Sequence, residues 1–151
     1  MLNSELSDYP QKIKKRILIQ ASSGKVWEHL TNPELMIEWM GDEEMKIEIL
    51  SDWKAGSAIT ISGFHHVHFE NKGTILQLEP GKIFRYEYLS SLSNLADEAK
   101  NHTTITFVLT PKENGTELCV EANNFPTFEI YKHLEFYWNG TLGIIKGRIE
   151  N

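Results

Sequence analysis

The residues best suited to a function in this chain are nine aromatic side chains. Aromatic rings supply the apolar walls of small-molecule sites, and a tyrosine hydroxyl adds a hydrogen-bonding group. We predict that they line a hollow between a sheet and a helix, with its mouth at Phe125-Pro126 and the 91–101 connection. The alternative is that most of them only fill the core. The predicted ligand-binding residues are Trp27, Trp39, Phe84, Tyr86, Tyr88, Phe107, Phe125, Tyr131 and Trp138.

Three histidines close together, His65, His66 and His68, suggest a metal site with Glu70. Imidazole and carboxylate groups both bind zinc. On a strand, His66, His68 and Glu70 would share one face, and neighbours on that face diverge at a spacing of roughly 6–7 Å. Because that face is expected to meet solvent, we predict no metal site here.

The chain shows no convincing catalytic set. There is no Ser-His-Asp order, glycine-rich phosphate loop or paired-cysteine motif. Nothing places any two carboxylates at the distance that acid–base catalysis requires. We therefore expect a binding protein rather than an enzyme, and we expect no cofactor. The carboxylates considered are Glu43, Glu44, Glu70, Glu87 and Glu121.

Composition excludes several classes of partner. The net charge is −6, and the single basic cluster, residues 12–16, alternates with isoleucine as a solvated strand edge does, so we expect no nucleic-acid binding. Cys119 is the only cysteine, which excludes an intramolecular disulfide. No apolar run approaches the length of a membrane span. We expect a cytoplasmic protein without membrane insertion.

The last apolar stretch predicts a long amphipathic helix over residues 128–149, because apolar residues recur there every three or four positions. Gly140 and Gly143 lie within it, and we expect them to let the helix approach a sheet closely. Such a helix across a curved antiparallel sheet leaves room for a ligand between the two.

Two short helices are predicted near the start of the chain. Ser22 or Ser23 is a suitable N-cap for the first, and Asn32 followed by Pro33 begins the second. Residues 1–11 are polar, and we expect them to be loose.

Seven strands are predicted from alternation and turn signals. Pro80-Gly81 and Asn114-Gly115 indicate tight turns. We also expect a turn within residues 63–66 and a bulge at Gly73. The clearest strand segments are 13–21, 45–50, 57–62, 84–88, 103–111 and 116–122, with a further strand around 74–78.

The element order predicts an α+β fold in a single domain, residues 1–151. Two short helices follow the first strand, and a curved antiparallel sheet wraps around the long C-terminal helix.

This order, with several local motifs, resembles the START-like helix-grip superfamily, also called SRPBCC or Bet v-like. Within it, the chain is most similar to bacterial homologues of the C-terminal domain of the activator of the ninety-kilodalton heat-shock protein ATPase. The likeness covers roughly residues 13–149. The motifs are Ile17–Thr31, then Pro33 with Trp39 and Met40, then Gly73–Pro80 followed by Phe84-Arg85-Tyr86, and finally Trp138-Asn139-Gly140 with Leu142, Lys146 and Ile149.

The resemblance implies a choice of functions, because one fold hosts many activities. A small-molecule binding protein for apolar, aromatic or lipid-like ligands is the leading expectation. A protein-interaction module that acts on a chaperone is the second. A polyketide cyclase or aromatase is the third, with Tyr86, Tyr88, His65 and Arg85 as its only polar candidates. The sequence leaves open whether the protein is a monomer or a homodimer.

Overall fold

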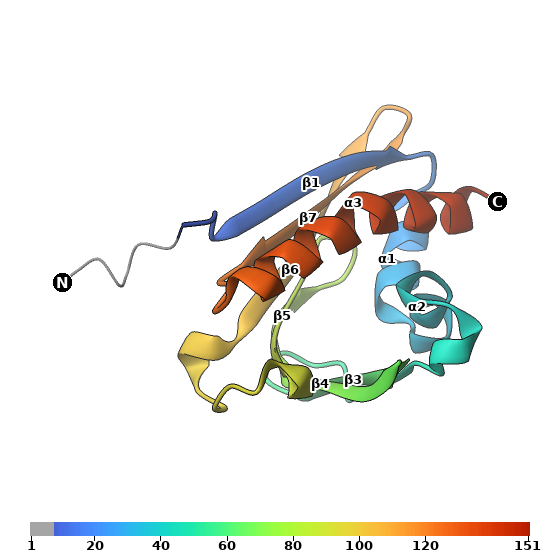
Figure 1. The fold of residues 1–151 in the computed structure, drawn as a ribbon. Coiled ribbons are helices and arrows are strands. Elements are labelled where there is room, and N and C mark those ends of the chain that lie inside the picture. Colours follow the sequence, from blue (N-terminus) through green and yellow to red (C-terminus); the bar gives the residue numbers. More distant parts are fainter. Residues whose placement is uncertain (1–7) are drawn as a thin grey trace.

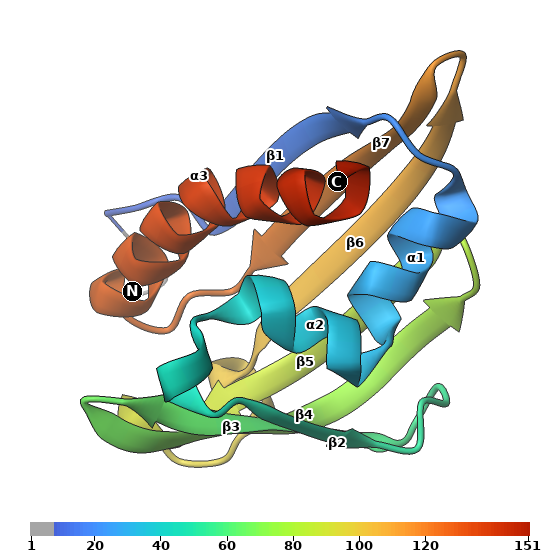
Figure 2. The same cartoon turned by 90° about the vertical axis from the view of Figure 1, so that its right-hand side faces the viewer.

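A computed structural model describes residues 8–151. One antiparallel sheet in the strand order β1-β7-β6-β5-β4-β3-β2 curves around the helices, and helix α3 lies across it (Figure 1). Figure 2 shows all three α-helices on the same, concave side of the sheet. The fold is therefore the predicted α+β helix-grip. The elements are β1 (Lys12–Ile19), α1 (Ser23–Thr31), α2 (Pro33–Met40), β2 (Glu48–Ser51), β3 (Ala58–His65), β4 (Val67–Glu79), β5 (Ile83–Ser90), β6 (Thr103–Lys112), β7 (Gly115–Asn123) and α3 (Phe128–Glu150), with short 3₁₀ helices at Glu43–Met45 (η2), Ser91–Ser93 (η3) and Ala99–Asn101 (η4).

Polar caps begin the two early helices as predicted. The Ser22 side chain accepts a hydrogen bond from the Lys25 amide, and the Asn32 side chain accepts one from Glu34. Each cap satisfies a backbone donor that the first turn of a helix leaves free. Both helices bury an apolar face, which places Trp39 of α2 over the concave side of the sheet.

Helix α3 packs chiefly along β1, the edge strand beside it. Its inward face buries apolar residues at helical spacing, as predicted. Polar contacts fasten it near both ends: the Lys15 ammonium lies 2.9 Å from the Glu135 carboxylate, and Lys146 donates to the Leu18 carbonyl at 2.7 Å. The buried residues of α3 are Leu134, Trp138, Thr141, Leu142, Ile145 and Ile149.

The glycines of α3 do not have the role expected for Gly140 and Gly143. Within the described part of the chain, a methyl group added at Gly140, Gly143 or Gly147 would meet no atom within 4 Å. These glycines therefore lie away from the sheet, and the prediction of close approach is wrong. The close approach occurs instead at Gly73, where a methyl group would collide with the backbone carbonyl of Glu87 on β5.

The region from β2 to β4 differs in detail from the prediction. Strand β2 begins at Glu48 because Asp42 caps a 3₁₀ turn that occupies residues 43–45. Strand β3 continues to His65, and the chain reverses at His66, whose φ of 67° is left-handed. The irregularity in β4 falls between Ile75 and Gln77 rather than at Gly73, which pairs regularly with Tyr88 of β5.

The described end of the segment expected to be loose, residues 8–11, is anchored. The Tyr9 hydroxyl donates to the Phe125 carbonyl at 2.9 Å, and the Gln11 side-chain oxygen accepts from the Phe125 amide at 2.8 Å. Residues 1–7 lie outside the described part of the chain. Among the helices of residues 8–151, none has the length and apolar character needed to cross a membrane.

Candidate ligand-binding site

Eight aromatic side chains form a continuous set of ring contacts between the sheet and the helices, which we call the interior cluster. Phe107 of β6 lies at its centre, with ring centroids 5.9 Å from Phe84 and 5.7 Å from Trp138. Tyr86 lies 5.2 Å from Phe84 on one side, and Tyr137 lies 5.0 Å from Trp138 on the other. The interior cluster comprises Trp39, Trp53, Phe84, Tyr86, Tyr88, Phe107, Tyr137 and Trp138.

Strand geometry explains how the sheet contributes to this cluster. Phe84, Tyr86 and Tyr88 alternate along β5, so all three point to the same face. The register pairs Phe84 directly with Phe107 across the β5–β6 ladder, and opposite side chains on one face of such a pair are in contact. The partners Trp39 and Trp138 come from the buried faces of α2 and α3.

A second group of aromatic residues, which we call the terminal cluster, lies at the N-terminal end of α3. Its members are Tyr9, Phe125, Phe128 and Tyr131, with the Tyr9 ring stacked on Tyr131 at 5.6 Å and Phe125 edge-on to Tyr131 at 5.4 Å. The N-terminal segment closes this group through the hydrogen bonds to Phe125. The terminal cluster therefore joins the N-terminal segment to the start of α3.

The nine predicted ligand-binding residues thus divide between three places. Six of them belong to the interior cluster, whereas Phe125 and Tyr131 belong to the terminal cluster. Trp27 lies half-buried on α1 against the general core. The six that the structure brings together are Trp39, Phe84, Tyr86, Tyr88, Phe107 and Trp138.

Some polar atoms of the interior cluster have a hydrogen-bond partner, and one does not. The indole N–H of Trp39 donates to the His29 carbonyl at 2.7 Å, and the Tyr137 hydroxyl donates to the Met40 carbonyl at 3.1 Å. The indole N–H of Trp138 is buried and has no hydrogen-bond partner among residues 8–151. Buried polar groups are normally hydrogen-bonded, so Trp138 is an exception in the middle of the predicted site.

The tyrosines of this cluster remain protonated over the ordinary pH range. Burial raises the pKa of Tyr86 and of Tyr88 well above its usual value, and the pKa of Tyr137 to about 12. The three hydroxyls are also close enough for the charge of one phenolate to raise the pKa of another. At neutral pH, each is a neutral hydroxyl in an apolar setting.

Two members of the cluster, Trp53 and Tyr137, are absent from the predicted set. Trp53 lies in the link between β2 and β3 with a left-handed φ of 55°, and a loop position gives no periodic signal for an inward ring. Tyr137 lies at the edge of the apolar face of α3, next to Trp138. It lies one helical turn from the buried residues Leu134 and Thr141. This spacing is the sequence signal that could have indicated an inward-facing ring at Tyr137.

The predicted mouth of the site has an ordered structure of its own. In the connection that follows β5, the His102 ring lies 3.1 Å from the Glu87 carboxylate and 2.7 Å from that of Asp97. Burial lowers the pKa of His102, but its hydrogen bonds to Asp97 and Glu87 and their charges raise it more, and the net change is upward. Asn124 donates to the carbonyls of Lys100 and His102. These contacts hold the connection against β5 and the end of β7.

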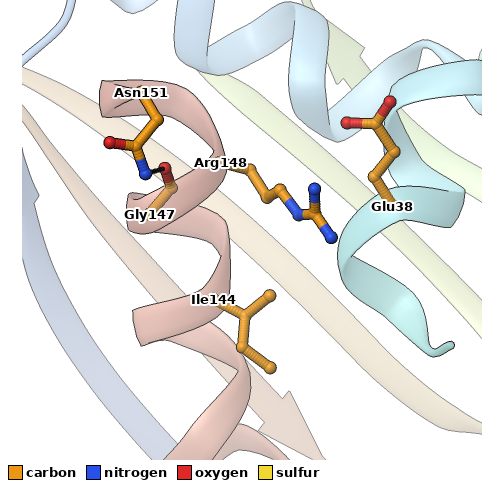
Figure 3. Close-up of a pocket in the computed structure, with 5 residues that line it drawn as sticks. All are labelled: Glu38, Ile144, Gly147, Arg148 and Asn151. Atoms are coloured by element: carbon orange, nitrogen blue, oxygen red, sulfur yellow. Dashed lines mark hydrogen bonds between the residues drawn. The ribbon is translucent and has the colours of Figure 1, made fainter.

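Two hollows in the surface lie away from the predicted residues. The larger, of about 440 Å³, is lined by Glu38 of α2 and by the last turns of α3. Figure 3 shows the Arg148 side chain reaching from α3 toward Glu38 across it. The smaller, of about 280 Å³, lies between η2 and β3. The expected aromatic cavity is neither of these, because the interior-cluster rings pack against one another.

The histidines considered as metal ligands do not converge. His66 occupies the turn between β3 and β4, and its ring is tilted by 60° against that of His65, with ring centroids 4.7 Å apart. Across residues 8–151, no group of three or more metal-binding side chains comes together.

Comparison with known proteins identifies the family. Residues 20–150 match the family model described as activator of Hsp90 ATPase homolog 1-like protein. The chain belongs to this family. A match over 131 of 151 residues covers every element from α1 to α3, which agrees with the resemblance inferred from the sequence motifs.

Solved structures share the fold of this family member. A protein from Cytophaga hutchinsonii is 34% identical over 96% of this chain and 97% of its own, with a TM-score of 0.78. A Chromobacterium violaceum protein is 19% identical, covering 95% and 99%, with a TM-score of 0.82. The Aha1 dimer from Colwellia psychrerythraea is 22% identical, covering 92% and 96%, with a TM-score of 0.72. Among proteins with curated functions, none matches the chain.

Proposed function

We propose that this family member is a small-molecule binding protein that holds an apolar, aromatic or lipid-like ligand among the rings of the interior cluster. The observation that carries the proposal is the buried indole N–H of Trp138, which has no partner within residues 8–151. Leaving such a donor unpaired costs about 1–3 kcal/mol, and an oxygen or nitrogen acceptor on a ligand would recover that cost.

The walls of the interior cluster support the same function. Aromatic rings from β5, β6, α2 and α3 surround a common region, and rings of this kind stack on flat or extended apolar molecules. Binding requires these rings to move apart, because they are in mutual contact in the structure. The shape of a bound molecule would then be set by Phe84, Phe107 and Trp138.

The first experiment is to denature the purified protein and analyse the released small molecules by mass spectrometry. We expect one lipid or aromatic compound in stoichiometric amount from the wild-type protein. Titration with lipids, flavonoids and polyketides, followed by tryptophan fluorescence, would then measure affinity, because Trp39 and Trp138 lie in the cluster.

A matched pair of variants separates interior binding from surface adsorption. Phe84→Trp enlarges a fully buried ring and should reduce the amount of bound compound, since overpacking removes the space that a ligand needs. Phe128→Trp makes the same change at a half-exposed ring of the terminal cluster and should leave the amount unchanged. A wild-type protein with no released compound and no saturable fluorescence response would contradict the proposal.

A second candidate function is a protein-interaction module that acts on a chaperone ATPase. The exposed ring of Phe136 on α3, of which 80% is accessible, favours a protein contact on the outside of this helix. Association with the heat-shock ATPase of the same cell, followed by its ATP turnover, tests this function. Phe136→Ser should abolish association, whereas Phe128→Ser should preserve it. Wild-type protein that neither associates nor changes turnover would exclude this role.

A further inference from the structure

The interior cluster contains one buried donor without a hydrogen-bond partner among residues 8–151, together with two tyrosine hydroxyls that can donate a hydrogen bond. The indole N–H of Trp138 can only donate a hydrogen bond, and it has no acceptor among residues 8–151. The hydroxyls of Tyr86 and Tyr88 are neutral, and no hydrogen bond contributes to the pKa of either. By contrast, the hydroxyl of Tyr137 is already engaged with the Met40 carbonyl. The cluster therefore offers up to three donors for one acceptor.

A basic side chain, His133, lies beside this cluster but is uncharged at neutral pH. His133 stacks on Tyr137 with ring centroids 6.2 Å apart, but burial and the nearby charge of His65 lower its pKa, so it is neutral there. Lys15 and Lys146 bind the carboxylates of Glu135 and Glu150 at the contact between α3 and β1. A buried carboxylate without a cationic partner is strongly disfavoured, and the chain as a whole carries a charge of −6.

We propose that the interior cluster selects ring-based apolar molecules that carry an uncharged carbonyl oxygen and rejects those that carry a carboxylate. The carbonyl oxygen accepts from the Tyr86 and Tyr88 hydroxyls or from the Trp138 indole, and the ring system lies against Phe84 and Phe107. This inference deepens the proposed function and rests on it, since it names the class of molecule that the same cluster binds.

Three tricyclic probes of equal ring size test the selection: 9-fluorenone, fluorene and fluorene-9-carboxylate. Their affinities for the wild-type protein are measured by isothermal titration calorimetry at pH 7. We expect fluorenone to bind at least about fivefold more tightly than fluorene, the gain of one net hydrogen bond. We expect the carboxylate to bind more weakly than fluorene, because its charge must be desolvated without a cation.

Variants locate the donor. Tyr88→Phe and Tyr86→Phe each remove one hydroxyl without changing the ring, and at least one should reduce the ratio of the affinity for fluorenone to the affinity for fluorene. Tyr9→Phe makes the same change in the terminal cluster and should leave both affinities unchanged. Circular dichroism and thermal unfolding verify that each variant is folded.

The outcomes separate this inference from the function on which it rests. Fluorene that binds as tightly as fluorenone, or a carboxylate that binds most tightly, would overturn the carbonyl preference while ligand binding itself stands. A preference unchanged in both Tyr86→Phe and Tyr88→Phe would exclude the tyrosine donors and assign the carbonyl to Trp138. If no probe binds, the inference is overturned, and the released-compound analysis decides the proposed function by itself.

Discussion

The interior cluster and the terminal cluster are built from similar aromatic residues but differ in how their polar atoms are used. In the terminal cluster, the Tyr9 hydroxyl donates to the Phe125 carbonyl, and the Phe125 amide donates to Gln11. In the interior cluster, Trp138 has an unpaired donor within the described chain, and Tyr86 and Tyr88 are desolvated hydroxyls.

This difference distinguishes a structural contact from a candidate binding site. Evolution can remove an unpaired buried donor with a single change, for example by replacing a tyrosine with phenylalanine. Groups that stay unpaired at a cost to stability are therefore suited to a partner from outside the chain. By this criterion, Phe125 and Tyr131 belong to the packing of the N-terminal segment against the start of α3, and the ligand proposal rests on the other cluster.

The largest expected difference concerns stability. Phe107→Ala removes a fully buried ring from the centre of the interior cluster and should lower the free energy of unfolding by about 3–5 kcal/mol. Phe128→Ala in the terminal cluster should cost less than about 1 kcal/mol, because 48% of Phe128 is exposed. Urea denaturation measures both. Equal losses would show that the two clusters do not differ in packing.

A smaller effect on the free energy of unfolding distinguishes the Tyr9 hydroxyl from the Tyr86 hydroxyl. Tyr9→Phe removes a hydrogen bond to Phe125 and should lower the free energy of unfolding by about 1 kcal/mol. Tyr86→Phe removes a buried hydroxyl without a contributing hydrogen bond, so it should be neutral or stabilising. Thermal unfolding of the two variants and the wild type checks whether Tyr9→Phe lowers stability while Tyr86→Phe does not. A clear loss for Tyr86→Phe would indicate that its hydroxyl already has a partner.

The third prediction concerns stability at high pH. An unfolded tyrosine ionises near pH 10, whereas burial raises the pKa of Tyr137 to about 12 and raises that of Tyr86 and Tyr88 as well. The unfolded state therefore loses these protons first, and stability falls as the pH rises from about 10 toward 12. Phenolate absorbance at 295 nm should increase together with the loss of circular dichroism.

A control sharpens this pH experiment. Tyr86→Phe removes one of the groups responsible, so the midpoint of alkaline unfolding should move to higher pH. An unchanged midpoint, or phenolate absorbance from all three tyrosines in the folded protein, would contradict the burial of their hydroxyls.

Local signals in the sequence predicted most of the fold. Capping at Ser22 and Asn32 and alternation through Phe84, Tyr86 and Tyr88 depend on a few neighbouring residues, and both appear where they were expected. The β6–β7 hairpin is also where it was expected, but Lys112 pairs with Gly115, so its turn is Glu113-Asn114, one residue earlier than predicted. The positions of the β4 irregularity and of the glycine contact were wrong. The first depends on how β5 pairs with β4, and the second on which side of α3 faces the sheet. Both are contacts between separate elements, which local patterns in the sequence do not show.

The same distinction limits the candidate site. Alternation showed that the β5 aromatics share a face, but it could not show that Phe125 and Tyr131 pack against Tyr9, because residue 9 lies more than a hundred positions away. Trp53 and Tyr137 were missed for a related reason, since a loop residue and a residue at the edge of a helix face have no clear inward phase. Which rings come into contact depends on how distant segments of the chain pack against one another.

The glycines of α3 also bear on how firmly this helix holds its shape. Gly140, Gly143 and Gly147 each lower intrinsic helix stability by about 1 kcal/mol relative to alanine, so α3 owes its shape to its docking along β1. A helix of this kind unwinds when it leaves its support. Entry of the proposed ligand to the interior cluster would then be coupled to local unfolding, and its residence time would follow the opening free energy of α3.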